Sequence, residues 1–220
     1  MKDLSPQTEK IFMALKEFEF LKEYTLIGGT ALSLQIQNRL SEDLDFCKWQ
    51  DKPGLRNKEI EWPKIEKLLR TIGPVEINIF DLFQIDFFVD DVKVSFYSNS
   101  IVNSREIQSG EFLGNINIAT IPSLGAMKLE VMLRRCLFRD YYDFYSILKE
   151  GYSLKNLVEM AGRYSKHNLK TKNILSILSD GSKFKKEENF SLLDPKYDVN
   201  SEEIQDFILS IIKKEFNRRK

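Results

Sequence analysis

Two short stretches hold the residues best suited to chemistry. A glycine pair in Gly28-Gly29-Thr30 closes an apolar segment, and Asp43-Leu44-Asp45-Phe46 follows shortly after. Side chains alternate along a strand, so Asp43 and Asp45 are expected to project the same way, with Cα atoms about 6–7 Å apart. A glycine turn that opens a helix receives phosphate oxygens, and paired carboxylates suit Mg²⁺. Together the two stretches predict a site for a Mg²⁺-nucleotide.

A second charged constellation lies further along the chain. Lys128, Arg135 and Arg139 are spaced as i, i+7 and i+11, so on one continuous helix they share a face. Asp140 and Asp143 are predicted in the first turn of the next helix, where the helix dipole favours anions. The structural alternative makes Lys128 a surface lysine, Arg139 a solvated cation and Asp140 a dipole residue. For Asp143 we favour the structural interpretation, in which its charge only stabilises the start of the helix.

The hydrophobic pattern predicts the elements that position these residues. Up to residue 121 it indicates a mixed sheet of four to six strands with flanking helices, including a hairpin whose two-residue turn is Asp90-Asp91. After Pro122 only helical periodicity remains. Strands first and helices afterwards indicate an α+β fold. We expect an α/β domain at 1–121 and a helical domain at 122–220.

Local signals refine these elements. The spacing from Ile11 to Leu21 predicts one helix that starts after Ser5. Ser153 and Ser201 are predicted as further N-caps. The other predicted helices lie near 123–135, 139–149, 153–164, 168–179 and 201–216, and Phe138, Tyr141, Tyr142 and Tyr145 are expected to pack a helical core rather than stack on bases.

Charge is balanced overall but uneven along the chain. The 220 residues carry 33 basic and 33 acidic side chains, so no global field argues for nucleic acid. Residues 149–186 hold nine Lys/Arg against three Asp/Glu, a net +6, and residues 76–111 hold two against seven, a net −5. The basic segment is either a surface for a phosphate backbone or a solvated helical face.

The sequence argues against several kinds of catalytic site, metal site and fold. A catalytic triad, a Cys-His pair or a His-rich zinc site would depend on the single histidine, His167, which lies in a polar stretch. Cys47 and Cys136 form no disulfide framework and are expected to be small buried hydrophobes in a reducing compartment. No apolar run approaches the ~20 residues that span a bilayer. We therefore expect a cytoplasmic protein without a membrane partner.

Together these residues resemble the AbiEii/AbiGii-type nucleotidyltransferase toxin family of the polymerase-beta-like nucleotidyltransferase superfamily. The stretch Gly28-Gly29-Thr30-Ala31-Leu32-Ser33-Leu34 is similar to the family pattern GG[ST]-A-L-x-L, and residues 39–46 are similar to R-x-S-x-D-[IL]-D-F. Lys128-Leu129 and residues 135–143 are similar to K-L and a later R-x-x-x-[KR]-D-x-x-D. The resemblance covers residues 24 to 148.

The resemblance implies an activity and a role for each matching residue. The activity is transfer of a nucleoside monophosphate from an NTP to an acceptor, with RNA or tRNA as the acceptor and a cognate antitoxin as protein partner, in a toxin–antitoxin or phage-defence system. The implied nucleotide-binding residues are Gly28, Gly29, Thr30, Arg39, Ser41 and Lys128. The implied catalytic residues are Asp43, Asp45, Lys128 and Asp140, of which Asp43 and Asp45 bind Mg²⁺, with Mn²⁺ as an alternative. The helical domain is expected to complete the active site.

One position departs from the superfamily pattern. Members often supply a third metal-binding carboxylate from a later strand, and Ser95 stands at that position here. Asp86, on the partner strand of the hairpin, is the nearest substitute, and we expect it not to take that role. Ser95 supports one alternative, a non-catalytic nucleotide-binding or interaction module of the same fold. A second alternative is a small-molecule, antibiotic-type nucleotidyltransferase, which needs an acceptor pocket more than a basic face.

Overall fold

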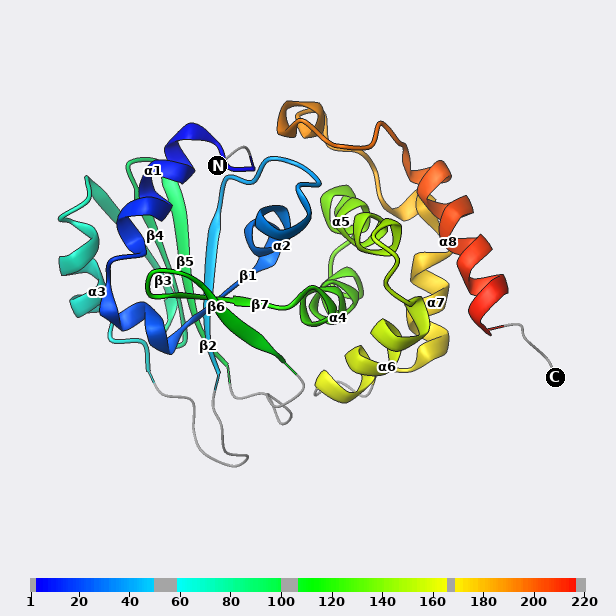
Figure 1. Ribbon diagram of the computed structural model, residues 1–220, viewed down its shortest axis with the longest axis horizontal. Coiled ribbons are helices and arrows are strands. Elements are labelled where there is room, and N and C mark those ends of the chain that lie inside the picture. The colour runs from blue at the N-terminus through cyan, green and yellow to red at the C-terminus, as the bar shows by residue number, and fades with distance from the viewer. Residues whose placement is uncertain (1–2, 50–58, 100–106, 166–168, 217–220) are drawn as a thin grey trace. The chain divides into compact units, whose positions relative to one another are not determined.

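The computed structural model describes residues 3–49, 59–99, 107–165 and 169–216. The chain divides into two compact units, Met1–Thr120 and Ile121–Lys220, each of which is described by itself (Figure 1). No helix in the described ranges is long and apolar enough to cross a membrane. His167 lies outside the described residues.

The first unit is built on a mixed sheet of seven strands in the order β3-β4-β5-β2-β1-β7-β6. β2 pairs in parallel with β5, and β1 with β7, while the other neighbours are antiparallel. Helix α1 contacts β5, α2 contacts β1 and β2, and α3 contacts β4 (Figure 1). The elements are α1 Pro6–Leu15, β1 Thr25–Ile27, α2 Gly28–Ile36, β2 Leu44–Trp49, α3 Trp62–Leu69, β3 Val75–Asp81, β4 Gln84–Val89, β5 Val92–Asn99, β6 Ser109–Leu113 and β7 Ile116–Ala119.

An apolar layer on one face of this sheet orients the acidic strand. Phe46 of β2 lies opposite Leu26 of β1 and Phe96 of β5, and all three side chains have no exposed surface. Asp45 precedes Phe46, so it points to the opposite face. A one-residue shift of β2 would expose Leu44 and Phe46, at roughly 1.5–3 kcal/mol for each side chain. The core therefore fixes the direction of Asp45.

The hairpin of β4 and β5 has the predicted turn. Asp90 and Asp91 have φ angles of 49° and 66°, and a two-residue hairpin turn with both residues at positive φ matches the twist of its strands. Asp90 also accepts a hydrogen bond from Lys10 Nζ at 2.9 Å. This turn sets the register in which β4 lies beside β5.

Some predictions for the first unit are wrong. The helix predicted to reach Leu21 ends at Leu15, and a 3₁₀ helix follows at Glu19–Glu23. The sheet has one strand more than the four to six predicted. Strand β6 lies at the sheet edge and is mostly exposed, so its sequence lacks the alternation that marks a half-buried strand.

The second unit consists of helices. Helix α4 contacts α5 and α6, and α8 contacts α5, α6 and α7. Its elements are α4 Ile121–Met132, α5 Phe138–Lys149, α6 Leu154–Tyr164, α7 Thr171–Leu178, α8 Ser201–Phe216 and the 3₁₀ helices Gly181–Lys183 and Phe190–Leu193. The sheet followed by helices confirms the predicted α+β class.

The aromatic side chains of α5 form the core of this unit, as predicted. Phe138, Tyr141, Tyr142 and Tyr145 are all buried. The ring of Tyr141 stacks on Phe184 with centroids 4.1 Å apart, and its hydroxyl donates to the Leu178 carbonyl oxygen at 2.7 Å.

Two of the three predicted helix caps are confirmed. The side chains of Ser5 and Ser153 accept hydrogen bonds from backbone amides of α1 and α6. Ser201 is not the cap of α8, because the Asn200 side chain accepts from the amides of residues 202 and 203 at 2.9 and 3.0 Å. Glu203 returns a bond to the Asn200 amide at 2.8 Å, which completes a capping box.

The two cysteines differ from each other. Cys47 is buried, as predicted, but Cys136 is exposed, in the turn between α4 and α5. Burial, and then the nearby charge of Asp45, raise the pKa of the Cys47 thiol well above its ordinary value. Cys47 therefore stays a neutral side chain within the acidic strand β2.

Candidate active site

The turn between β1 and α2 depends on the absence of a side chain at Gly28. Gly28 has φ +76°, and a Cβ there would lie 2.6 Å from Asp45 Oδ2. No side chain caps the N-terminus of α2, because residue Ile27 precedes it in extended conformation. The first amides of a helix have no partner within the helix. An acidic side chain and an uncapped helix N-terminus are thus brought together at the first residue of α2.

Gly29 makes room for a cation at the same turn. A Cβ on Gly29 would lie 2.6 Å from Arg39 Nη2 and 3.5 Å from Ser41 Oγ. Arg39 and Ser41 are only 6% and 5% exposed, and Arg39 Nη1 donates to the Leu40 carbonyl oxygen at 2.9 Å. The guanidinium approaches the start of α2 this closely only because residue 29 is a glycine.

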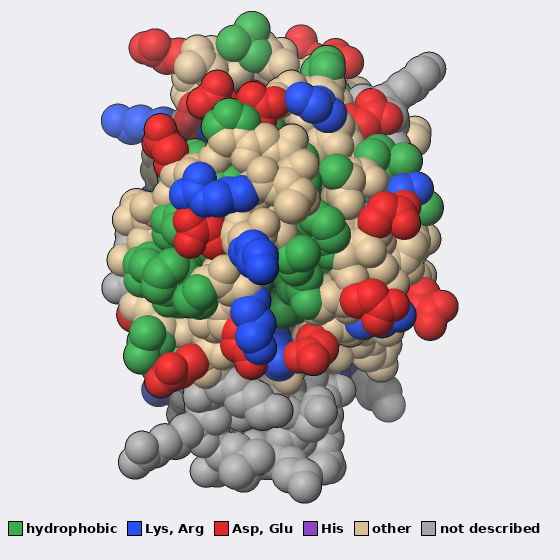
Figure 2. Space-filling view, turned by 90° about the vertical axis from the view of Figure 1, so that its left-hand side faces the viewer, with side chains coloured by type: hydrophobic (Ala, Val, Ile, Leu, Met, Phe, Trp, Pro, Cys, Tyr) green, Lys and Arg blue, Asp and Glu red, His purple; other side chains and the backbone are tan. Residues whose placement is uncertain are grey.

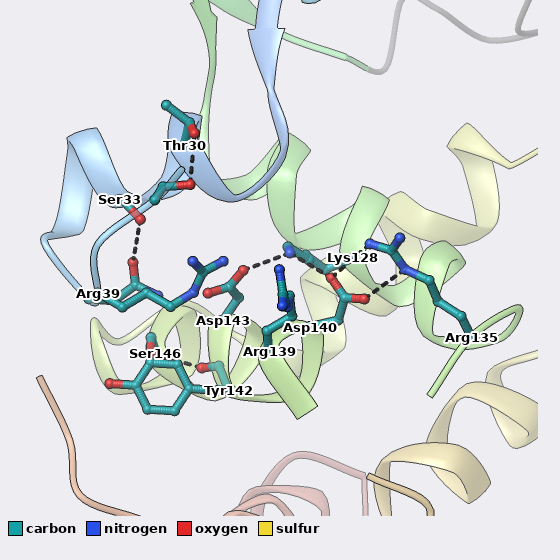
Figure 3. A network of polar contacts seen from close by, with 12 residues as sticks. Thr30, Ser33, Arg39, Lys128, Arg135, Arg139, Asp140, Tyr142, Asp143 and Ser146 are labelled. Carbon is teal, nitrogen blue, oxygen red and sulfur yellow. Dashed lines mark hydrogen bonds and ion pairs between the residues drawn. The ribbon is translucent and has the colours of Figure 1, made fainter. Parts of the chain in front are cut away.

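Thr30 ties the glycine turn to the acidic strand. Its hydroxyl shares a hydrogen bond of 2.7 Å with Ser41 Oγ and donates to the carbonyl oxygen of Asp43. Thr30 is 1% exposed and lies at the start of α2 (Figure 3). The hydroxyl therefore holds the segment before β2 in place against α2.

The two acids of the strand have different surroundings. Asp43 is exposed and precedes β2, so it is not inside the strand as predicted, while Asp45 is half-buried within it. Tyr97 Oη lies 3.4 Å from Asp45 Oδ1. Burial, followed by the charge of Asp45, raises the pKa of Tyr97 above its ordinary value. Tyr97 therefore keeps its proton and remains a hydrogen-bond donor for Asp45.

The carboxylates of Asp43 and Asp45 are ligands that suit Mg²⁺. In the described part of the chain, no three His, Cys, Asp or Glu side chains gather into a metal-binding group. Two carboxylates still fit Mg²⁺, because this ion usually keeps several waters and takes substrate phosphates as further ligands. The space that a Cβ of Gly28 would fill beside Asp45 supports the same fit.

Lys128 lies at the centre of a buried ion-pair network in the second unit. Its ammonium is 2.8 Å from Asp140 Oδ1 and 2.6 Å from Asp143 Oδ2 (Figure 3). Lys128 comes from α4 and both acids come from α5. The three side chains are 9%, 1% and 0% exposed. The interpretation of Lys128 as a surface lysine is therefore wrong.

Arg135 completes this network at its exposed side. Arg135 Nε is 3.0 Å from Asp140 Oδ2, and its side chain is 57% exposed. Burial alone would raise the pKa of Asp140, but Lys128 and Arg135 outweigh it and hold this pKa below its ordinary value. Asp140 thus remains a carboxylate, and the two cations balance the charges of Asp140 and Asp143.

The three cations would share a face only on one continuous helix, and the structure has two helices here. Helix α4 ends at Met132 and α5 begins at Phe138, so no continuous helix carries Lys128, Arg135 and Arg139. Arg139 pairs with Glu187 at 3.1 Å and is not simply solvated. Asp140 lies in the first turn of α5, as predicted, whereas Asp143 lies one turn later.

The predicted site residues thus fall into two groups. The first unit brings together Gly28, Gly29, Thr30, Arg39, Ser41, Asp43 and Asp45, and the second unit brings Lys128 to Asp140. The sequence predicts only a local role for Asp143, at the start of the helix, and misses its ion pair with Lys128. The signal that could have indicated this pair is the i, i+3 spacing from Asp140, which places both acids on one helix face.

The described cations of the basic segment predicted at 149–186 are all exposed. Its exposed cations are Lys149, Lys155, Arg163, Lys170, Lys172, Lys183, Lys185 and Lys186. Lys183 pairs with Asp180 at 3.3 Å, and Lys186 lies 4.0 Å from Asp198. Exposed pairs of this kind contribute little to stability. The described cations outnumber the acids Glu150, Glu159 and Asp180, so the segment carries a net positive charge.

One protein-family model matches most of this chain. The model of the family described as "Nucleotidyl transferase AbiEii toxin, Type IV TA system" matches residues 11–216. An uncharacterized protein of Aquifex aeolicus (strain VF5) is 24% identical over 161 residues, which are 73% of this chain and 75% of that protein.

Solved structures share the fold. A putative nucleotidyltransferase from Helicobacter pylori superposes with a TM-score of 0.55 at 19% identity, covering 98% of this chain and 99% of that one. JHP933 from Helicobacter pylori gives 0.52 at 21%, covering 96% and 94%. The nucleotidyltransferase toxin MenT4 from Mycobacterium tuberculosis H37Rv gives 0.54 at 14%, covering 95% and 86%. Since the family model spans nearly the whole chain, the chain belongs to the AbiEii family of nucleotidyltransferase toxins of type IV toxin–antitoxin systems.

Proposed function

We propose that this nucleotidyltransferase transfers a nucleoside monophosphate from an NTP to an RNA acceptor in a Mg²⁺-dependent reaction. One observation carries the proposal. A Cβ at Gly28 would lie 2.6 Å from Asp45 Oδ2, so the acid stands directly against the uncapped N-terminus of α2. A Mg²⁺-triphosphate needs this combination, because carboxylate oxygens hold the cation and helix amides receive the phosphate oxygens.

Asp43 and Asp45 are the residues that would hold the metal. Bound Mg²⁺ supplies charge stabilisation to the triphosphate and lowers the pKa of the acceptor hydroxyl. Tyr97 orients Asp45 through its hydroxyl, and Thr30 holds the segment that carries Asp43. These contacts hold the Asp45 side chain and the backbone at Asp43 in place before substrate binds, which lowers the cost of binding.

Arg39 and Lys128 are the candidate residues that supply positive charge. Arg39 places its guanidinium beside Gly29, where it would neutralise phosphate oxygens received by α2. Lys128 and Asp140 are proposed as charged residues of the same reaction on the family resemblance alone. Asp143 and Arg135 position them, because both contact this pair directly.

The acceptor and the partner protein follow from charge and from family. The exposed cations of residues 149–186 suit a phosphate backbone better than a small neutral acceptor. RNA, with tRNA as its first candidate, is therefore the proposed acceptor. A cognate antitoxin is the proposed protein partner, because the family belongs to type IV toxin–antitoxin systems. We propose that the protein acts in the cytoplasm, where NTPs and RNA are present.

Label transfer tests the reaction directly. The protein is incubated with each α-³²P-labelled NTP, Mg²⁺ and total RNA, and label in RNA is measured on a denaturing gel. Asp43→Asn should abolish transfer, whereas Glu42→Gln, which changes the adjacent exposed acid, should retain it. Equal transfer by wild type and Asp43→Asn would contradict the proposed metal site.

Salt separates the two kinds of acceptor. For RNA, the apparent affinity should fall steeply and linearly in a plot of log affinity against log salt concentration. Neutralising Lys170 and Lys172 together should make that slope shallower. A salt-independent acceptor affinity would favour the small-molecule alternative instead.

A further inference from the structure

A row of polar side chains crosses the sheet beside the candidate metal site. Asp45 on β2 lies in register with Ser95 on β5, and Ser95 lies in register with Asp86 on β4. Directly paired residues of neighbouring strands point to the same face. Ser95 is fully buried and Asp86 is 2% exposed. The row therefore reads carboxylate, hydroxyl, carboxylate, with no acid at its middle position.

Lys93 places a cation on this row. It lies two residues before Ser95 on β5, so it shares the same face. Its ammonium is 2.9 Å from Asp86 Oδ2, and its side chain is 35% exposed. Burial alone would lower the pKa of Lys93, but Asp86, then Asp45 and Asp43, outweigh it and raise this pKa above its ordinary value. The ammonium therefore stays charged, and its direct partner is Asp86.

Asp86 is half satisfied by this pairing. Its Oδ2 accepts from Lys93, while its buried Oδ1 has no hydrogen-bond partner in the described part of the chain. A buried carboxylate without a cation is costly, and Lys93 is the cation that the structure pairs with Asp86. Together, Asp43, Asp45, Asp86 and Lys93 carry a formal charge of −2, which a single divalent ion balances.

We propose that Lys93 supplies the positive charge that a second divalent ion would otherwise bring to this row, so that the chain holds one divalent ion, at Asp43 and Asp45. The inference rests on the Mg²⁺-dependent reaction proposed above and defines its metal stoichiometry. It accounts for Ser95, because a hydroxyl at the middle of the row leaves no acid to bridge two ions. Lys93 acts through Asp86 and the metal, so it is a positioning residue.

Metal titration tests this without relying on turnover. Mn²⁺ alone is titrated into the full chain, and free Mn²⁺ is measured by electron paramagnetic resonance. Wild type should bind one ion per chain. K93Q changes the formal charge of Asp43, Asp45, Asp86 and position 93 together from −2 to −3, so it should bind Mn²⁺ about tenfold more tightly or take up a second ion. K93R, which keeps the charge, should behave as wild type.

A charge-balanced variant guards against effects of misfolding. K93Q/D86N has the wild-type formal charge of −2 and leaves no unpaired buried carboxylate, so its Mn²⁺ affinity should return to the wild-type value. K10Q is the matched control, because Lys10 pairs with Asp90 at the same 2.9 Å at a more exposed site. K10Q should leave Mn²⁺ binding unchanged.

Several results would overturn the inference. Two ions in wild type, or a K93Q variant with one ion at unchanged or weaker affinity, would show that Lys93 does not replace a metal ion. Failure of the proposed reaction looks different: D43N would then bind Mn²⁺ as wild type does, or wild type would bind none, and both proposals would fall together.

Discussion

Replacing Lys128 with methionine tests the buried network of the second unit. The ammonium of Lys128 pairs with Asp140 at 2.8 Å and with Asp143 at 2.6 Å, among side chains that are at most 9% exposed. Methionine keeps the length of the side chain and removes the charge, so two carboxylates lose their shared cation. Breaking a buried ion pair by removing one partner costs about 3–5 kcal/mol.

Arg135 reduces that cost. It still contacts Asp140 at 3.0 Å after the substitution, so Asp140 keeps one cation. We therefore expect a loss near the lower end, about 3 kcal/mol. The matched control is Arg134→Met, because Arg134, which is 58% exposed in the turn after α4, forms an i, i+4 pair with Glu130. An exposed pair of this kind contributes only about 0.3–0.5 kcal/mol.

Urea unfolding followed by far-ultraviolet circular dichroism measures both losses. The double variant Lys128→Met/Asp143→Asn separates charge from packing: removing one carboxylate should recover part of the loss, with a coupling energy of about 1–3 kcal/mol. A Lys128→Met variant as stable as Arg134→Met, or a coupling energy near zero, would refute the claim that this network is a buried electrostatic unit.

Two further predictions concern single positions. Gly28→Ala should destabilise the first unit by at least about 1–2 kcal/mol, because it forces a left-handed residue and places a Cβ 2.6 Å from Asp45 Oδ2. Gly151→Ala is its control, since Gly151 also has positive φ but has no atom within 4 Å of the added Cβ; equal losses in chemical denaturation would argue against the close approach. Stability should also fall on acidification. The pKa of Asp140 is held below its ordinary value, so its contribution is complete above the unfolded pKa of about 4 and is lost as pH falls through the native pKa. Asp140→Asn should therefore be less stable than wild type at neutral pH and lose less between about pH 5 and pH 2, and parallel pH profiles would be the contrary result.

The sequence predicts elements well where the signal is local. Alternating apolar residues and a two-residue Asp90-Asp91 turn identify the β4–β5 hairpin. The glycine pair and the acids that follow it identify the turn that opens α2. Such signals suffice because periodicity and turn chemistry act over a few neighbouring residues.

Other features depend on contacts that no local pattern reveals. Helix α4 ends at Met132, three residues before the predicted end at 135, and neither glycine nor proline among residues 133–137 marks that end. Asp143 pairs with Lys128 only because α4 packs on α5. The edge strand β6 is mostly exposed. Its sequence therefore does not alternate between apolar and polar residues.

The row of Asp45, Ser95 and Asp86 lies between these extremes. The hairpin turn predicts that Asp86 faces Ser95, but the pairing of β5 with β2 is a contact between segments far apart in sequence. We expect Asp86 not to act as a third metal ligand, which stays a prediction. Its ion pair with Lys93 at 2.9 Å engages one of its two carboxylate oxygens.

The most direct test of the central claim is a crystal structure of the wild-type chain with Mn²⁺ and a non-hydrolysable NTP. The anomalous signal of Mn²⁺ locates the metal independently of the protein density. We expect one peak in contact with Asp43 and Asp45, and triphosphate oxygens hydrogen-bonded to the first amides of α2. A metal peak away from both acids, or a triphosphate ordered elsewhere, would contradict the account.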